Sequence, residues 1–106
     1  MTTFDDRENA YENKFARDNE TEFKITMRRN KLVGYWAADQ MGLKESDRDA
    51  YAKAVVESDF EVPGDDDVVA KVHGDLEKSG LSLTERDVRE AMHRLKEEAR
   101  QQILNG

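Results

Sequence analysis

Apolar residues recur every three to four positions in five stretches of the chain, which is the spacing of one face of an α-helix. This spacing predicts helices over about residues 4–18, 21–41, 47–59, 66–78 and 85–104. A single proline among 106 residues also favours helical structure. The first stretch carries a thin apolar stripe among polar residues, so we expect only a marginal helix there.

Glycines and capping residues mark the expected helix ends. Gly42 and Gly80 follow the second and fourth stretches and are typical of helix stops. Ser46 stands where the third helix would take its N-cap, and Val62-Pro63-Gly64 breaks the chain after that helix. Capping-box spacing precedes the last helix twice, in Ser82 with Glu85 and in Thr84 with Asp87.

Two residues of the second stretch predict how it packs. Gly34 lies inside the expected helix, where glycine costs about 1 kcal/mol relative to alanine. We therefore expect a neighbouring helix to approach closely at this position. Trp36 follows two residues later, and we expect it in the core because tryptophan is usually a packing residue.

The lengths of the connections indicate the architecture. Helices joined by two to six residues are usually antiparallel neighbours. We predict an all-α fold in which residues 20–106 form an antiparallel four-helix bundle domain. Residues 1–19, here called the arm, precede the bundle as a marginal or mobile amphipathic helix.

Charge and composition exclude several classes of function. The net charge of −7 argues against nucleic acid or an anionic membrane as the main partner. Only residues 23–45 are net basic, with five bases and two acids. The absence of cysteine excludes disulfides and cysteine zinc sites. No apolar run approaches the ~20 residues of a membrane helix, and the acidic N-terminus is unlike a signal peptide, so we expect a cytoplasmic protein.

Candidate catalytic and metal-binding residues are few. Asp65-Asp66-Asp67 lacks the alternating ligands of a calcium loop, and we interpret it as the acidic start of a helix. His73 and His93 lie on different predicted helices with no third ligand, so we place both at the surface or its boundary. No nucleophile motif is present. We predict no metal, no cofactor and no enzymatic activity.

A second hypothesis concerns adenine nucleotides. Arg28, Arg29 and Lys31 offer positive charge for a phosphate group, and Tyr35 or Trp36 offers a ring for stacking on adenine. No glycine-rich phosphate loop accompanies them. We therefore favour a solvated helix face with Trp36 in the core, and weak nucleotide binding is the alternative.

Phe4, Tyr11 and Phe15 give the arm three of the eight aromatic residues in the chain. A terminal tail is by default frayed, and a mere tail would be richer in Gly, Ser and Pro. Aromatic residues at helical spacing can anchor a segment in a groove on a partner. They can equally pack onto the chain's own bundle, and the residues alone leave both interpretations open.

Four segments resemble a known family. They are Phe4–Ala16 (FDDRENAYENKFA), Arg28–Ala38 (RRNKLVGYWAA), Tyr51–Val56 (YAKAVV) and Asp59–Glu61 (DFE). Together they resemble the zeta subunit, the inhibitor of the F-type ATP synthase of alphaproteobacteria. The first two segments are specific, because their identities go well beyond a helical pattern.

The resemblance implies a four-helix bundle with a mobile N-terminal inhibitory segment. In that family the segment inserts as a helix at a catalytic interface between alpha and beta subunits, near the gamma rotor. It blocks ATP hydrolysis and largely spares synthesis. The implied protein is a regulatory subunit, a monomer when free, that lies peripheral to the inner membrane through the ATP synthase.

Carried onto this sequence, the resemblance makes the arm the inhibitory segment. We assign the roles by helical face. The apolar anchors are Phe4, Tyr11 and Phe15. The polar contacts to the partner are Arg7, Glu8, Glu12, Lys14 and Arg17.

Overall fold

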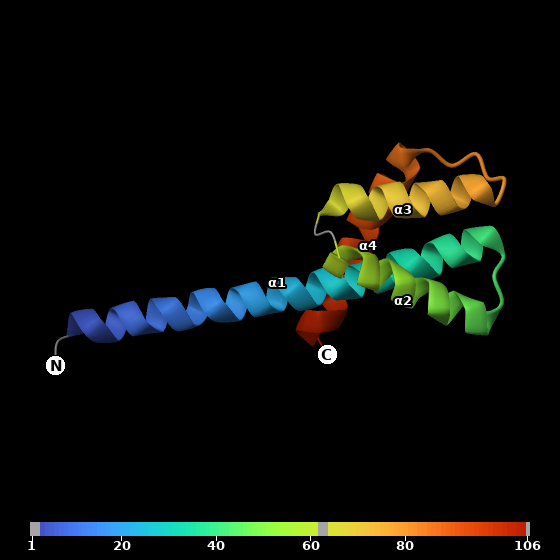
Figure 1. Cartoon of the computed structure of the whole chain (residues 1–106). Helices are drawn as coiled ribbons and strands as arrows, with labels where there is room; N and C mark the ends of the chain where they lie inside the picture. The colour runs from blue at the N-terminus through green and yellow to red at the C-terminus, as the bar shows by residue number, and fades with distance from the viewer. Residues whose placement is uncertain (1–2, 62–63, 106) are drawn as a thin grey trace.

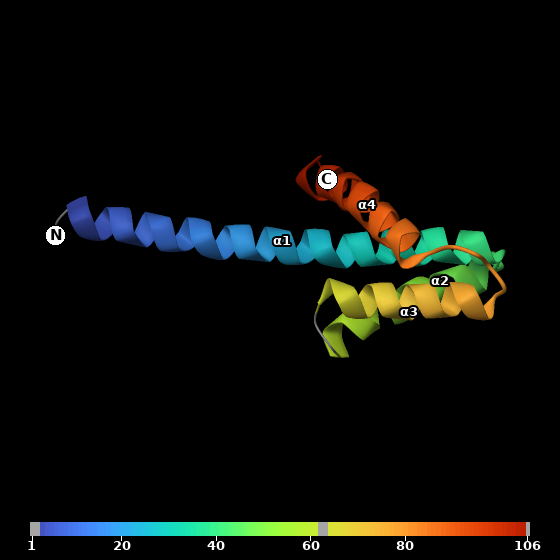
Figure 2. The ribbon, with the colours of Figure 1, turned by 90° about the horizontal axis from the view of Figure 1, so that it is seen from above.

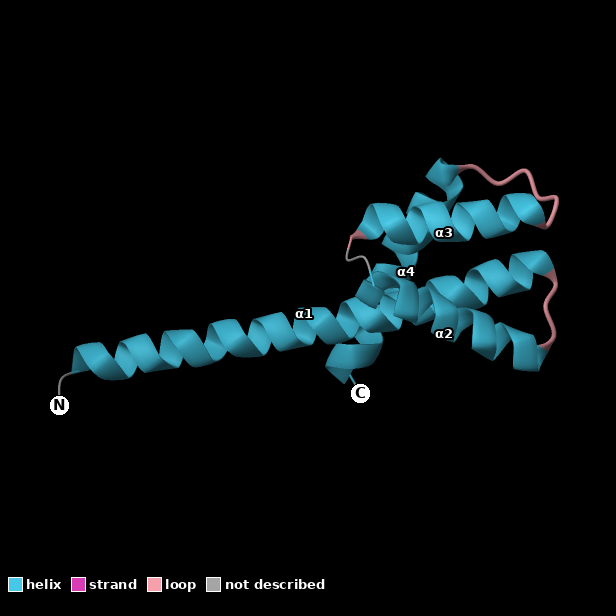
Figure 3. Cartoon of the chain, viewed as in Figure 1, coloured by secondary structure: helices cyan, strands magenta, loops and turns pink. Residues whose placement is uncertain are grey.

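The computed structural model describes the backbone of residues 3–61 and 64–105, and the side chains of residues 20–59 and 64–105. Over this part of the chain there are four α-helices and no strand (Figures 1 and 3). They are α1 (Thr3–Met41), α2 (Glu45–Glu61), α3 (Asp65–Lys78) and α4 (Glu85–Asn105). The predicted all-α class with four bundled helices is confirmed.

One continuous helix replaces the two that the apolar spacing predicts before residue 42. α1 has 39 residues, which at 1.5 Å per residue makes it about 58 Å long. It accounts for most of the 65 Å long axis of the molecule. Neither glycine nor proline stands between residues 4–18 and 21–41, and asparagine lowers helix propensity by less than about 1 kcal/mol. The join therefore remains helical.

The other three helices gather on the C-terminal half of α1. α2 returns antiparallel to it, α3 runs back beside α2, and α4 crosses α1 obliquely (Figures 1 and 2). α1 contacts all three of the others, whereas α2 and α4 lie on different sides of it. The half of α1 that contains the arm runs on beyond the bundle (Figure 1).

Branched and small apolar residues fill the space between the helices. Val33 and Ala37 of α1 face Val55 of α2, and valines from α3 and α4 close the core from the other side. Trp36 is partly buried and packs against this core, as predicted. The remaining members of the core come from α3 and α4: Val68, Val69, Val72, Leu76, Val88, Ala91, Met92 and Leu95.

Tyr51 joins α2 to α3 at the edge of the core. Its hydroxyl donates to Asp75 Oδ2 at 2.8 Å, and Lys71 Nζ lies 3.2 Å from the same oxygen. Burial, and then the hydrogen bond to Asp75, raise the pKa of the Tyr51 phenol. The phenol therefore stays protonated as the donor of this bond.

Two helices end as the glycine positions predict. Gly42 adopts a φ of 71° and donates to Asp39 O, while Leu43 N donates to Ala38 O. Gly80, with a φ of 82°, repeats the pattern at the end of α3. These paired bonds form a Schellman motif, which needs a left-handed residue that glycine supplies without steric cost.

The predicted helix starts are partly right. Thr84 N donates to Asp87 Oδ2 at 2.9 Å, and Asp87 N donates to Thr84 Oγ1 at 3.2 Å, so this capping box is confirmed. The hydrogen bonds with Thr84 lower the pKa of Asp87. Ser46 as an N-cap is wrong, because α2 already begins at Glu45. Val62 and Pro63, the expected chain break, lie outside the described residues.

Gly34 lies where α1 and α2 approach each other closely. A Cβ atom at Gly34 would stand 2.5 Å from Ala52 Cα and 3.0 Å from Ala52 Cβ. Both distances are below ordinary van der Waals contact, and one partner atom is backbone. The close helix approach predicted at Gly34 is confirmed.

We predict that Gly34→Ala destabilises the protein by about 1–3 kcal/mol, because α1 and α2 must separate to admit the methyl group. Gly74→Ala is the matched control. Gly74 also lies within a helix, but no atom lies within 4 Å of its Cβ position. The control should stabilise by about 0.5–1 kcal/mol through helix propensity alone. Urea unfolding measures both, and equal effects would contradict the close crossing.

Candidate functional site

The arm and the bundle share one helix, so the positions of the arm have a fixed register relative to the core. Tyr11 and Arg29 are 18 residues apart, as are Phe15 and Val33, which is about five turns of α-helix. Arg29 and Val33 are 4% and 0% exposed. The aromatic positions of the arm therefore lie on the side of α1 that the bundle buries further along.

All eight predicted partner-contact residues precede residue 20, where the described side chains begin. Their assignment stays a prediction. The backbone places all eight residues on one helix, Thr3–Met41. The part of this helix that carries them runs beyond the other three helices (Figures 1 and 2). The two ends of the aromatic stripe, Phe4 and Phe15, are 11 residues apart, or about three turns.

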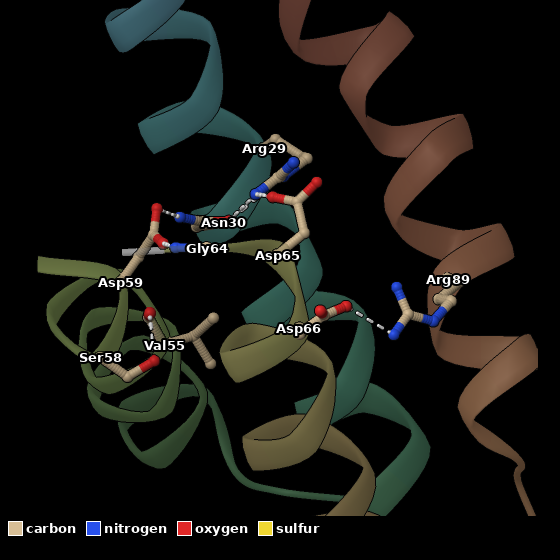
Figure 4. A network of polar contacts seen from close by, with 9 residues as sticks. All are labelled: Arg29, Asn30, Val55, Ser58, Asp59, Gly64, Asp65, Asp66 and Arg89. Carbon is tan, nitrogen blue, oxygen red and sulfur yellow. Dashed lines mark hydrogen bonds and ion pairs between the residues drawn. The ribbon is translucent and has the colours of Figure 1, made fainter. Parts of the chain in front are cut away.

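A polar network holds the bundle together near the base of the arm (Figure 4). Arg29 donates from Nε and Nη2 to Asn30 Oδ1 at 3.2 and 2.8 Å. Its Nη2 also lies 3.0 Å from Asp65 Oδ1. Asn30 Nδ2 donates to Asp59 Oδ2 at 2.9 Å, and Gly64 N donates to Asp59 Oδ1 at 3.2 Å. These five residues are called the latch.

The latch satisfies two polar side chains that the helix packing buries. Asn30 is 1% exposed and Arg29 is 4% exposed, whereas the carboxylate of Asp65 is 63% exposed. Among the described residues, no buried side-chain nitrogen or oxygen lacks a hydrogen-bond partner. A buried guanidinium needs such partners, since leaving it unpaired costs several kcal/mol. The latch thus fixes the ends of α2 and α3 against α1.

The acidic start of α3 also forms an ion pair with α4. Asp66 Oδ1 accepts from Arg89 Nη2 of α4 at 2.8 Å, and this hydrogen bond raises the pKa of Arg89 (Figure 4). The three acids occupy the first turn of α3, as predicted, but the N-cap residue is Gly64 and makes no side-chain cap bond. Two of the acids instead tie α3 to α1 and α4, which the sequence interpretation missed.

The residues proposed for nucleotide binding are divided by the fold. Arg28 Nε donates to Gln102 Oε1 of α4 at 2.5 Å, and Arg29 belongs to the latch. Trp36 packs against the core. Only Lys31 and Tyr35 remain together, on the rim between α1 and α2.

Tyr35 is at the centre of a polar surface cluster. Its hydroxyl donates to Asp49 Oδ1 at 3.0 Å, and its ring centroid lies 4.1 Å from the Arg48 guanidinium carbon and 5.9 Å from Lys31 Nζ. Tyr35, Lys31 and Asp49 border a surface hollow of about 480 Å³ together with Lys53 and Val56. Nucleotide binding by the original five residues stays a prediction.

The histidines occupy the surface or its boundary, as predicted. His93 is exposed, and His73 has a side chain 20% exposed with Nε2 3.4 Å from Glu77 Oε1. In the described part of the chain, no group of three or more metal-ligating side chains could hold a metal ion. Over the same residues, no helix has the length and apolar character needed to cross a membrane.

The family model of the ATPase inhibitor subunit zeta matches residues 1–102, which include the arm and nearly all of the bundle. The chain belongs to this family. No curated protein matches it. Membership in a family of ATPase inhibitor subunits supports a regulatory role in place of a catalytic one.

Two residues of the latch, Arg29 and Asn30, belong to one of the segments that carry the family resemblance. The interpretation of Arg28, Arg29 and Lys31 as a solvated helix face is wrong for Arg29, because this side chain is 4% exposed. One signal was available: Asn30, Val33 and Ala37 follow helical spacing, so a polar residue stands within a buried apolar stripe. A buried amide at such a position needs a partner from another helix.

We predict that Asn30→Ala lowers the free energy of unfolding by about 1–3 kcal/mol, because Asp59 and the buried Arg29 each lose a partner. Lys24→Ala is the control, since it removes an exposed pair to Glu20 at 3.6 Å. Exposed pairs of this kind contribute little, so the control should have almost no effect. Chemical denaturation of the full chain tests both, and equal losses would contradict a stabilising latch.

Proposed function

We propose that this protein inhibits ATP hydrolysis by the F-type ATP synthase by inserting its arm at a catalytic interface between an alpha and a beta subunit, near gamma. In this proposal the bundle stays outside the interface and carries the arm. The protein would then be found at the cytoplasmic side of the membrane that holds the ATP synthase, attached through that enzyme.

The observation that carries the proposal is the continuation of one helix face. On the bundle side this face is buried by other helices, with Ile25 and Val33 at most 1% exposed. On the arm side the same face of α1 runs beyond the other helices with aromatic residues at positions 4, 11 and 15 (Figure 1). A helix face of this kind is suited to a groove on another protein.

The continuity of α1 also bears on affinity. Binding of a disordered segment costs free energy, because its backbone and side chains must be ordered. A segment that extends an already folded helix needs no new helix nucleus, and nucleation is the unfavourable step of helix formation. The bundle would thereby lower the cost of ordering the arm at its target.

We predict that the intact chain inhibits ATP hydrolysis by the purified cognate F-type ATPase and that a variant lacking residues 1–19 does not. Among the described side chains, the buried core residues lie between Ile25 and Ala99, so the deletion leaves all of these in place. A coupled assay of ATP hydrolysis measures the effect. Far-ultraviolet circular dichroism and thermal unfolding verify that the shortened chain remains folded.

A full-length variant controls for the deletion itself. Replacing Phe4, Tyr11 and Phe15 together by alanine keeps the length and charge of the arm but removes its apolar face. It should lose inhibition as the deletion does. Inhibition that survives in both variants would contradict the arm mechanism, and absence of inhibition by the intact chain would contradict the proposed function.

The second candidate function is nucleotide sensing. It is supported by the hollow between α1 and α2, where Lys31 and Lys53 bring two positive charges beside Tyr35. Arg28, Arg29 and Trp36 have other contacts in the fold, so the candidate rests on fewer residues than the sequence suggested. It is compatible with inhibition, because a regulator can bind both nucleotide and enzyme.

Titration of ADP or ATP into the isotopically labelled chain tests nucleotide sensing. We expect saturable amide shifts centred on Lys31, Tyr35 and Lys53, and weaker shifts in the Lys53→Ala variant. Unchanged spectra at millimolar nucleotide would remove this function.

A further inference from the structure

A groove lies at the base of the arm, between α1 and the C-terminal end of α2. Its volume is about 280 Å³, and one wall is formed by the apolar Phe23, Met27 and Val56 together with Thr26. Four latch residues also line it: Asn30, Asp59, Gly64 and Asp65. Phe23 is 53% exposed and is one of two large apolar side chains exposed in the described part of the chain.

We propose that this groove is a second docking surface for the ATPase, taking an apolar side chain that is flanked by a lysine or arginine. The inference rests on the proposed function, because its partner is the enzyme that the arm would enter. It adds a contact of the bundle itself, separate from the inhibitory contact of the arm.

The size of the groove favours a protein side chain over a small-molecule ligand. Small-molecule sites usually have volumes of roughly 300–1,000 Å³ and enclose most of the ligand. This groove is smaller and has an exposed aromatic residue at its edge. Exposed aromatic residues beside a hollow are typical of the anchors of protein interfaces.

The polar end of the groove indicates the charge of the partner. Asp59 accepts hydrogen bonds only from neutral donors within the latch, the amide of Asn30 and the backbone N–H of Gly64 (Figure 4). No ion pair with a cation of the described residues involves Asp59, whereas Asp65 is paired with Arg29. Among the described residues, the groove thus presents a carboxylate without an ion-pair partner next to an apolar wall, which a basic residue would complement.

The position of the groove brings it to the same partner as the arm. Thr26 in its wall is 11 residues from Phe15, or about three turns along one helix. An enzyme that held the arm would have its surface next to this part of α1. Two contacts on one rigid helix would bind together with higher affinity than either alone.

The test is binding of full-length variants to the purified cognate F-type ATPase immobilised on a sensor surface, with ATP hydrolysis measured in parallel. Phe23→Ala should raise the dissociation constant about tenfold while leaving inhibition at saturation complete. Leu104→Ala is the control, since Leu104 is 62% exposed and lies outside the groove. It should change the constant by less than about twofold.

Equal binding by the Phe23→Ala and Leu104→Ala variants would overturn the groove and leave the arm mechanism intact. Binding without inhibition by the intact chain would refute the proposed function, and the groove would still be judged by the same two variants. Absence of binding would refute both. A concentration-dependent dimer that Phe23→Ala abolishes, seen by sedimentation, would assign the groove to a second copy of this chain and overturn the proposal.

A second pair of variants tests the predicted basic residue. Asp59→Asn and Asn30→Ala both disturb the hydrogen bond between Asn30 and Asp59, but only the first removes the negative charge. Asp59→Asn should therefore weaken binding more, and its binding should depend less on salt concentration. Equal losses with equal salt dependence would contradict recognition of a cation.

Discussion

The close approach of α1 and α2 at Gly34 and Ala52 is the contact on which the rest of the bundle depends. Because there is no Cβ atom at Gly34, the two helix backbones meet there, and Val33, Ala37 and Val55 become core residues. α3 packs beside α2 and α4 crosses the other side of α1, so both take their places from this pair. A bulkier residue at the crossing would shift the whole core.

The N-terminal half of α1 has a different relation to this core. It continues the same helix, and its aromatic positions follow the buried face in register, but no other helix covers it (Figure 1). A single helix therefore serves the chain's own core at one end and offers an apolar face at the other. In the proposed function, this division would separate the stability of the bundle from partner binding by the arm.

Electrostatics at the base of the arm are arranged by the fold and not by net charge. Although the chain carries a net charge of −7, the basic Arg29 is buried against the acidic start of α3. Within the latch, Asp65 forms an ion pair with Arg29. Asp59 accepts a hydrogen bond from the neutral amide of Asn30 and lines the groove. The proposed docking groove and the buried polar contacts thus share residues of one small cluster, where helix ends from α2 and α3 reach α1.

The sequence by itself determined which regions are helical, two of the glycine stops, the capping box at Thr84 and the tight crossing at Gly34, because each depends on local backbone preference or on helical periodicity. It also carried the family resemblance. The apolar spacing divided α1 into two helices, although no helix breaker stands at the join. Only the tertiary structure decided that Arg29 is buried beside Asp65, and that Arg28, Arg29 and Trp36 are separated from Lys31 and Tyr35. These outcomes depend on contacts between residues far apart in the chain, such as Arg28 and Gln102, which are 74 positions apart. Periodicity gives the face on which a residue lies, but it does not identify the helix that covers that face.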